Sequence, residues 1–287
     1  MSWTTYRVVL RPTGPLHIGA AKIGNLQRTR PYVIGRTLWG ALTMRLARDR
    51  PAAPAAADYV AMGKRVHEAL AFTYFYVTLD PAGQSEPPWP WAAEEAFGSR
   101  YLAGYAATAT EARGQSAAAT TLHEIEQILP VTRDGRPVYL VGYVFERDDA
   151  DGPALDWRGA LNRLQLGGER SYGWGGVRVA RVVEKLPAGQ AALFGRADVV
   201  AGADGDRPVV RLEAGAPLLA HTVVDPGLPV RGRVEPLVGR VWADGDGRRP
   251  DYSGLCYLPG GAVAEPATVA IDRFGIWRRT NHAGPSG

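Results

Sequence analysis

The sequence contains little cysteine and little lysine. Its single cysteine, Cys256, excludes an intramolecular disulfide and a zinc site built on cysteines. No apolar run approaches the roughly 20 residues that a membrane-crossing helix requires. The first seven residues lack the basic and then apolar layout of a secretory signal. We therefore expect a cytoplasmic protein without a membrane partner.

The motifs of common cofactor and metal sites are also missing. Gly63-Lys64 is followed by Arg65, whereas a phosphate-binding P-loop needs Ser or Thr there. None of the five histidines stands four residues from another, as the ligands of a helical metal site do. The acidic stretch 148–152 has Arg147 where a calcium loop has its first ligand, which indicates a solvated turn. We predict no cofactor, no metal site and no metal-dependent nuclease.

Glycine, proline and arginine are abundant instead. The 35 glycines and 22 prolines among 287 residues divide the chain into many short elements and disfavour an all-helical bundle, while 46% apolar residues suffice for a packed core. The net charge of +4 is too small to indicate a nucleic-acid partner by itself. However, 30 of the 33 basic residues are arginine, whose guanidinium binds phosphates and stacks on bases. A GC-rich genome explains the same bias, so its meaning stays open.

Hydrophobic periodicity predicts alternating strands and helices in the first two thirds of the chain. Strands are expected at 4–11, 72–79, 138–145 and 177–183, and helices at 37–50, 58–71 and 155–166. This order is that of a split βαβ sandwich, so the predicted class is α+β. We expect a first domain over residues 1–186, with an insertion at about 51–130, and a β-rich C-terminal region over 187–287.

The predicted insertion holds an aromatic group. Its members are Trp89, Trp91, Phe97 and Tyr101. Such a group forms either a small local core or a surface for a partner protein. The sequence leaves both interpretations open.

Residues 167–176 form the segment with the most chemical information, and we name it the glycine-rich segment. Five of its ten residues are glycine, interleaved with Arg170, Ser171, Tyr172 and Trp174. Backbone amides, a guanidinium, a hydroxyl and aromatic faces together suit a sugar-phosphate chain with stacked bases. A tight connection between a helix and a strand needs glycine for its geometry alone. Composition does not separate the two explanations.

The loop after the first strand carries a further candidate, His17. A loop histidine flanked by glycine can act as a general acid or base, although such histidines are more often hydrogen-bonding fixtures. A polar stretch with Lys22 and Arg28 follows and offers cations to phosphates.

Three segments together resemble the RAMP superfamily of CRISPR-associated proteins. Residues 166–175, Leu-Gly-Gly-Glu-Arg-Ser-Tyr-Gly-Trp-Gly, are similar to its glycine-rich loop, residues 15–19 to the loop after its first strand, and residues 34–42 to the start of its first helix. The resemblance implies a ferredoxin-like, RRM-like fold with a glycine-rich loop. Where the family helix has a basic residue and an arginine, this sequence has Trp39 and Thr43, and Arg36 and Arg45 are the available substitutes.

Within that superfamily the chain looks most like a Cas-five-type subunit of a type III or closely related effector. The resemblance implies an RNA-binding subunit without catalysis, which caps the 5′ handle of the crRNA, seats Cas-seven-type backbone subunits and docks a large or nuclease subunit. The implied RNA-binding residues are Lys22, Arg28, Arg36, Arg45, Gly167, Gly168, Arg170, Ser171, Tyr172, Gly173, Trp174 and Gly175.

Two alternatives remain open. One is a Cas-six-like endoribonuclease that processes CRISPR repeat RNA without a metal, with His17 as its acid or base. The other is a generic RNA-binding or assembly module, in which Gly168 and Arg170 only pack a turn.

Overall fold

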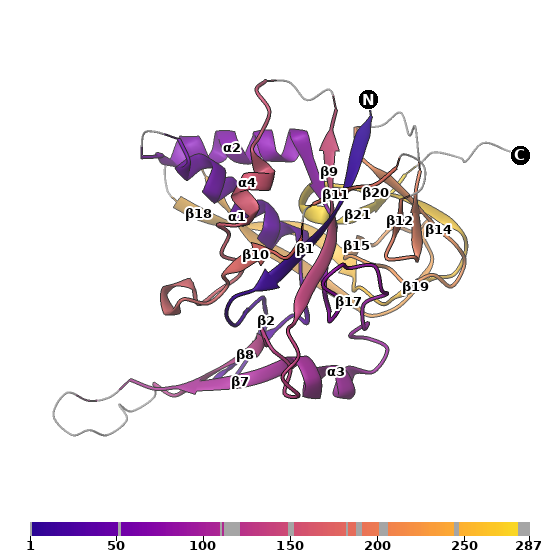
Figure 1. Ribbon diagram of the computed structural model, residues 1–287. Helices are drawn as coiled ribbons and strands as arrows, with labels where there is room; N and C mark the ends of the chain where they lie inside the picture. Colours follow the sequence, from indigo (N-terminus) through magenta and orange to yellow (C-terminus); the bar gives the residue numbers. More distant parts are fainter. Residues whose placement is uncertain are drawn as a thin grey trace, which may run out of the picture.

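The computed structural model describes residues 2–50, 53–109, 111, 121–148, 152–181, 183–187, 191–200, 206–243 and 247–280. Parts of the predicted insertion, of the acidic stretch 148–152 and of the C-terminal region lie outside these ranges. Within them, short helices pack against extensive sheets (Figure 1), which confirms the predicted α+β class.

A central antiparallel sheet organises the first part of the chain. Its order is β10 (Val177–Val179), β1 (Trp3–Pro12), β9 (Tyr139–Arg147), β6 (Phe75–Thr78), β4 (Tyr32–Val33), with β11 (Glu184–Lys185) also on β1 and β5 (Leu70–Phe72) on β9. The β1–β9 pair runs in register from Trp3 opposite Arg147 to Leu10 opposite Leu140. Because β9 is buried on both faces, its sequence is a continuous apolar run rather than an alternating one.

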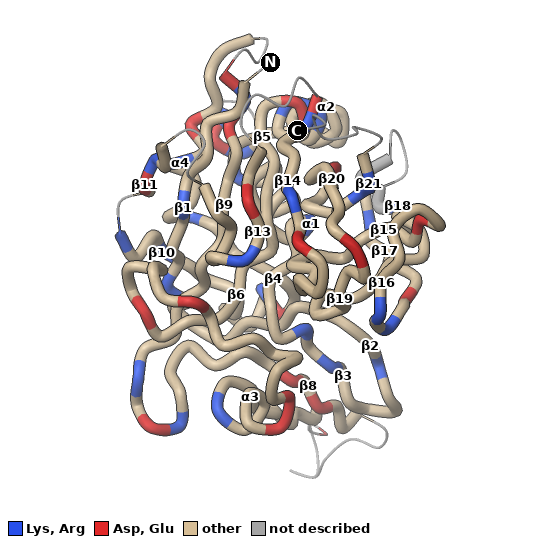
Figure 2. Tube along the Cα trace, turned by 90° about the vertical axis from the view of Figure 1, so that its right-hand side faces the viewer, with Lys and Arg blue, Asp and Glu red and all other residues tan. Residues whose placement is uncertain are grey.

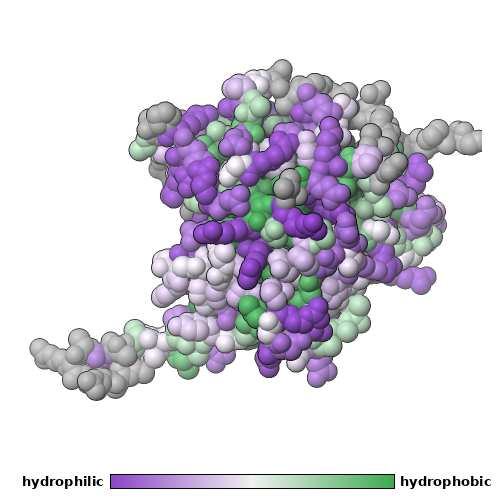
Figure 3. All heavy atoms as spheres, in the orientation of Figure 1, coloured by the Kyte–Doolittle hydropathy of each residue, from purple (hydrophilic) through white to green (hydrophobic). Residues whose placement is uncertain are grey.

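Helices cover one face of this sheet. They are α1 (Gly35–Arg48), α2 (Ala56–Ala69) and the short α4 (Trp157–Leu161). Leu38, Leu42 and Leu46 lie on the buried side of α1, as their spacing of four predicts. The outer side chains over α2 and α4 are mostly hydrophilic (Figure 3). The helix expected at 155–166 is only five residues long, because the chain beyond Leu161 turns back and Gln165 forms a β-bridge with Gly176.

The opposite face of the central sheet is covered by the C-terminal part. That part forms a second sheet, in the order β12 (Ala192–Leu193), β13 (Ala197–Val199), β14 (Val209–Leu212), β20 (Ala267–Ile271), β21 (Trp277–Arg279), β15 (Thr222–Val223), β18 (Gly247–Tyr257), β17 (Val234–Ala243). Tyr76 and Phe145 of the central sheet share one apolar core with Leu219 and Trp277. The two parts of the chain are therefore joined by common packing.

A third sheet projects from the body as an arm (Figure 1). Its order is β2 (Gly19–Ile23), β3 (Leu26–Thr29), β8 (His123–Ile128), β7 (Leu102–Ala107), and α3 (Glu94–Tyr101) precedes β7. Of the predicted insertion, α3, β7 and β8 belong to this arm, whereas α2, β5 and β6 belong to the central sheet and its helices. A separate two-stranded sheet pairs β16 (Val230–Arg231) with β19 (Ala262–Val263).

The four aromatic residues of the insertion do not form one cluster. Phe97 and Tyr101 are 5% and 4% exposed and join the core beneath the helices. Trp89 stacks on Trp91, with ring centroids 4.9 Å apart, and both pack against Tyr76 in the other core. These rings thus contribute to the packing of the body.

None of the helices within the described residues is long and apolar enough to span a membrane.

Candidate nucleic-acid interface

The glycine-rich segment is held against the loop that follows β1. The N–H of Gly168 donates to the carbonyl oxygen of His17 at 2.9 Å, and the N–H of Gly175 donates to that of Pro15 at 2.8 Å. Gly167, Gly173 and Gly175 have φ values of 80°, 82° and 87°, in the left-handed region that favours glycine. The two loops, about 150 residues apart in sequence, form one rigid ridge beside the start of α1.

Side chains of this ridge differ in their exposure. Residues Arg170–Tyr172 form a 3-10 turn, η1, on which the ring of Tyr172 is 68% exposed. Trp174 is 9% exposed and packs edge-on against Tyr105, with ring centroids 5.6 Å apart. Of the two aromatic residues predicted to stack on bases, only Tyr172 presents a free ring face.

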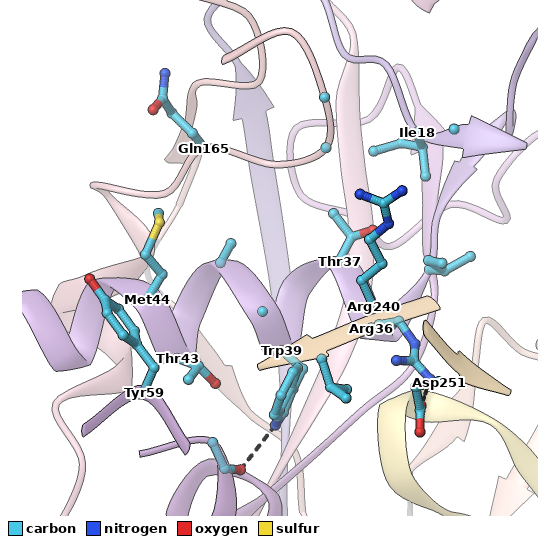
Figure 4. A pocket seen from close by; sticks show the side chains of 18 of the residues that line it. Ile18, Arg36, Thr37, Trp39, Thr43, Met44, Tyr59, Gln165, Arg240 and Asp251 are labelled. Carbon is cyan, nitrogen blue, oxygen red and sulfur yellow. Dashed lines mark hydrogen bonds and ion pairs between the residues drawn. The ribbon is translucent and has the colours of Figure 1, made fainter. Parts of the chain in front are cut away.

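A cavity of about 1190 Å³ lies between α1, α2, the glycine-rich segment and the β17–β18 hairpin (Figure 4). Its basic lining residues are Arg36, Arg48, Lys64, Arg170, Arg240, Arg249 and Arg273, and its acidic ones are Glu68, Glu169 and Asp251. On the face shown in Figure 2, by contrast, basic and acidic residues are interspersed. A concave surface with a surplus of positive charge concentrates anions, and phosphates in particular.

Availability of these cations depends on their partners. Lys64, Arg240 and Arg249 are exposed, and within the described residues none of them forms a salt bridge. In Figure 4 the Arg240 side chain extends past Thr37, while that of Arg36 turns to Asp251. Three cations from α2, β17 and β18 are therefore free to bind phosphate.

Arg36 connects the hairpin to α1. Its guanidinium pairs with Asp251, donates to the hydroxyl of Ser253 at 2.8 Å and lies 3.6 Å from the ring centroid of Phe274. Burial lowers the pKa of Arg36, an effect that its bond to Asp251 opposes. This arginine lines the cavity, but its contacts are internal.

Only some of the residues predicted to bind RNA meet at the cavity. Of that set, the lining includes Arg36, Gly167, Gly168 and Arg170, and it does not include Lys22, Arg28, Arg45, Ser171, Tyr172, Gly173, Trp174 or Gly175. His17, the candidate acid or base, also lines the cavity. Lys22 is exposed on β2. Arg28 donates to Glu126 at 2.9 Å, and Arg45 pairs with Asp49 at 2.6 Å. The predicted set thus divides between the cavity, the ridge, the arm and, for Arg45, helix α1.

His17 is 6% exposed and fixed in orientation. Its Nδ1 lies 2.8 Å from the carbonyl oxygen of Glu126. Because a carbonyl only accepts hydrogen bonds, Nδ1 carries the proton, and a neutral ring then has its lone pair on Nε2. The imidazole lines the cavity and anchors the first loop to β8.

Sequence reasoning missed five basic residues of the cavity lining, which are Arg48, Lys64, Arg240, Arg249 and Arg273. Arg240 and Arg249 lie on either side of the hairpin turn, and this proximity could have been predicted from the sequence. The packing of the hairpin against α1, which brings these two arginines to the same cavity as Lys64, could not.

A buried polar network holds the base of the hairpin. Glu235 of β17 pairs with Arg30 at 2.7 Å and with Nε2 of His221 at 2.8 Å, and Nδ1 of His221 lies 2.8 Å from the hydroxyl of Tyr74. Burial alone would raise the pKa of Glu235, but the hydrogen bond from His221 and the charge of Arg30 lower it to about 2. The ionised carboxylate ties β17 to Arg30, which directly follows β3, and through His221 to Tyr74, which directly precedes β6.

Among the described residues, no group of three or more His, Cys, Asp or Glu side chains is placed to hold a metal ion.

Comparison with known proteins yields a likeness of structure only. No family model and no curated protein sequence matches the chain. A chain in the cryo-EM structure of Type III-B Cmr-beta bound to cognate target RNA and AMPPnP superposes with a TM-score of 0.50 at 11% identity, over 90% of this chain and 85% of that one. A chain in the structure of Type III-B Cmr-beta bound to cognate target RNA gives a TM-score of 0.47 at 10% identity, over 90% of this chain and 86% of that one. The sheet-rich α+β fold described above is thus one that a chain of Type III-B Cmr-beta shares.

Proposed function

We propose that this protein is a non-catalytic RNA-binding subunit of a CRISPR effector ribonucleoprotein. In this role it caps the 5′ handle of the crRNA and bridges Cas-seven-type backbone subunits and a large or nuclease subunit in antiviral defence. The observation that carries the proposal is the cavity, where seven basic and three acidic side chains surround a space of about 1190 Å³.

The strand order supports a ferredoxin-like RAMP domain. The strands that match the βαββαβ pattern are β1, β6, β9 and β10, and in the sheet they stand in the order β10, β1, β9, β6. The likeness of fold to one chain of Type III-B Cmr-beta, a complex whose structure was determined bound to cognate target RNA, supports the same assignment.

The proposed binding mode follows from which surfaces are open. In an RRM the exposed face of the sheet binds RNA. Here the C-terminal sheet covers that face through the core shared by Tyr76, Phe145 and Trp277. RNA is therefore held on the helical side, with its phosphates on Lys64, Arg240 and Arg249 and one splayed base on the exposed ring of Tyr172.

Recovery of the bound RNA tests this function. The tagged chain is purified from the cells that contain its native operon, and the associated RNAs are sequenced while the copurifying proteins are identified. We expect RNAs of uniform 5′ end that begin with one short repeat fragment, together with repeated backbone subunits. Random RNA, or a handle-deleted crRNA bound as tightly as the intact one by the purified complex, would contradict the capping role.

A metal-independent endoribonuclease is the second candidate, because His17 lines the cavity among arginines that could stabilise a developing charge. Against it, the ring is nearly buried and its Nδ1 is engaged by a backbone carbonyl.

A further inference from the structure

Helices α1 and α2 contain three glycines, and packing explains two of them. A Cβ at Gly35 would collide with the carbonyl of Phe274, and one at Gly63 would stand 2.8 Å from the ring of Trp39. At Gly40, by contrast, a Cβ would meet nothing within 4 Å, and the backbone there is that of a regular helix. Because glycine inside a helix is less favourable than alanine, the packing of the fold gives no reason for Gly40.

Gly40 lies on the wall that α1 contributes to the cavity (Figure 4). Arg36 and Arg48 stand at the two ends of this wall, and the residues between them that line the cavity beside Gly40 are neutral. Residues three and four positions apart share one face of a helix. We name this uncharged surface the α1 strip, and its residues are Thr37, Gly40, Ala41 and Met44.

The α1 strip suits a flat, apolar group better than a phosphate. The N–H of Gly40 lies beyond the first four of the helix and is bonded within it, so no amide is available to an anion. No Cβ covers the helix at this point, and the thioether of Met44 makes favourable contacts with aromatic rings. A peptide strand laid here would leave its own amides without partners, because the carbonyls of a helix interior are paired as well.

Charge around the strip narrows the class of ligand further. Lys64, Arg240 and Arg249 line the same cavity and attract anions. A ligand that matches both the uncharged strip and these cations has a planar face and an anionic group. Nucleotides combine the two, since the faces of a base stack on apolar surfaces and the phosphate is charged.

Thr43 supplies a second, independent observation. It lines the cavity one turn from Gly40 and is 4% exposed, and within the described residues its hydroxyl has no hydrogen-bond partner. A buried hydroxyl without a partner is unfavourable. Threonine in a helix has two accessible χ1 rotamers, so the hydroxyl can turn to a ligand beside it. A hydroxyl donates and accepts, and it can therefore bond to the edge of a base.

We propose that the α1 strip is the binding site of one unstacked nucleobase of the RNA. The flat face of the base lies on Gly40 and Met44, its edge bonds to the hydroxyl of Thr43, and the adjoining phosphates are held by the cations of the cavity. This base differs from the one on Tyr172, which lies outside the cavity lining. The inference rests on the proposed RNA binding and adds to it a site for a base.

Filling the strip tests the proposal. Gly40→Leu covers it, and Gly98→Leu in α3 is the matched control, because a Cβ at Gly98 also meets nothing within 4 Å and Gly98 does not line the cavity. Leucine is the better helix former, so neither variant should have a lowered thermal midpoint. Each protein is titrated with a fluorescein-labelled single-stranded RNA that carries the repeat-derived 5′ handle. We expect a loss of about tenfold in affinity for Gly40→Leu and none for Gly98→Leu.

Two further readouts separate a base from a phosphate. The slope of log affinity against log salt should be the same in Gly40→Leu as in the wild type, since no phosphate contact is removed. The RNA is also prepared with one abasic residue at each position in turn. At one position the missing base should cost the wild type about tenfold and Gly40→Leu nothing more, because both changes remove the same contact.

Thr43→Val tests the contact with the edge of the base. Valine keeps the shape of threonine and removes the unpartnered hydroxyl, so the thermal midpoint should not fall. The affinity for the intact RNA should nevertheless fall about fivefold, the effect of one hydrogen bond. A purely structural threonine would leave RNA affinity unchanged, and that result would overturn this contact.

The outcomes distinguish this site from the proposed function. If the wild type binds the RNA and Gly40→Leu binds it equally well, or if the abasic losses all add to that of Gly40→Leu, the site is wrong and RNA binding stands. A wild type that binds no RNA overturns both. Loss of a copurifying protein from Gly40→Leu at unchanged RNA affinity would assign the strip to a protein instead. Equal binding of intact and handle-deleted RNA, both weakened by Gly40→Leu, would contradict capping and support the site.

Discussion

Gly167 lies directly against the backbone of His17, so closely that a Cβ at Gly167 would stand 2.2 Å from the carbonyl oxygen of His17. No real Cβ contact is that short. Gly175 is in the same situation, with a Cβ 2.3 Å from the carbonyl oxygen of Leu166. At these two positions the packing of the ridge requires glycine, whether or not a ligand is present.

Gly167→Ala should therefore destabilise the fold far more than Gly173→Ala. Both residues have positive φ, which costs about 1 kcal/mol for a residue with a Cβ, but a Cβ at Gly173 meets nothing within 4 Å. We expect Gly167→Ala to lose about 3 kcal/mol or more of unfolding free energy, since backbone must move. Urea denaturation checks this. Equal losses in the two variants would contradict the ridge geometry.

Neutralising the free cations of the cavity should weaken RNA binding and its dependence on salt. For Arg240→Gln and Arg249→Gln we expect the slope of log affinity against log salt to fall by about 0.7 per substitution, the value for one phosphate of a single strand. Fluorescence titration of the handle RNA at several salt concentrations measures it. Arg45→Gln is the control, because Arg45 is paired with Asp49 outside the cavity lining. A larger fall of this slope in Arg45→Gln than in Arg240→Gln and Arg249→Gln would indicate that RNA binds outside the cavity.

Removing the charge of Glu235 should leave the buried cation Arg30 without its acidic partner. Arg30 is 8% exposed and pairs with Glu235. Breaking a buried ion pair from one side costs about 3–5 kcal/mol, so Glu235→Gln should lower the thermal midpoint markedly. In the wild type the pKa of Glu235 is lowered to about 2, so its stabilisation is present above pH 4.5 and is lost as the pH falls toward 2. Calorimetry of both proteins at several pH values measures this, and an unchanged midpoint at pH 7 would refute the role of the network.

His67 should make stability depend on pH in a second window. Burial and the positive charges of Arg207 and Arg273 lower its pKa from 6.5 to about 4. The folded protein thus binds fewer protons than the unfolded one, and the free energy of unfolding falls as the pH drops from 6.5 toward 4. His67→Gln should lose less stability across this window than the wild type, as urea midpoints will show. Parallel curves for the two proteins would rule out the assigned cause.

His17→Asn distinguishes the binding role from the nuclease role. The side-chain amide of asparagine can replace Nδ1 as the donor to the carbonyl oxygen of Glu126, so the first loop should stay anchored. The substitution removes Nε2, the ring nitrogen that could act as the acid or base. If the protein only binds RNA, neither the wild type nor this variant cleaves repeat RNA in EDTA, and their affinities agree. EDTA-resistant cleavage that His17→Asn abolishes would establish the nuclease instead.

Some features of this protein could be predicted from local sequence. Leu38, Leu42 and Leu46 recur at the period of a helix, because the residues on the buried side of a helix are apolar at regular intervals. The sequence of β9 is a continuous apolar run, because both faces of this strand are buried. The glycines of segment 167–176 could also be recognised, although not the reason for them, which is the contact between Gly167 and His17.

Tertiary structure alone decided which side chains are available for binding. The sequence does not distinguish Arg36, Arg45 and Arg240 as candidate phosphate ligands. In the structure Arg36 forms an ion pair with Asp251 and Arg45 forms one with Asp49. Within the described residues, Arg240 forms no salt bridge. Trp174 is likewise packed against Tyr105, whereas Tyr172 is open. The physical reason is that an ion pair or a ring contact depends on which distant segment the fold brings near. Periodicity along one element records its burial but not its neighbours.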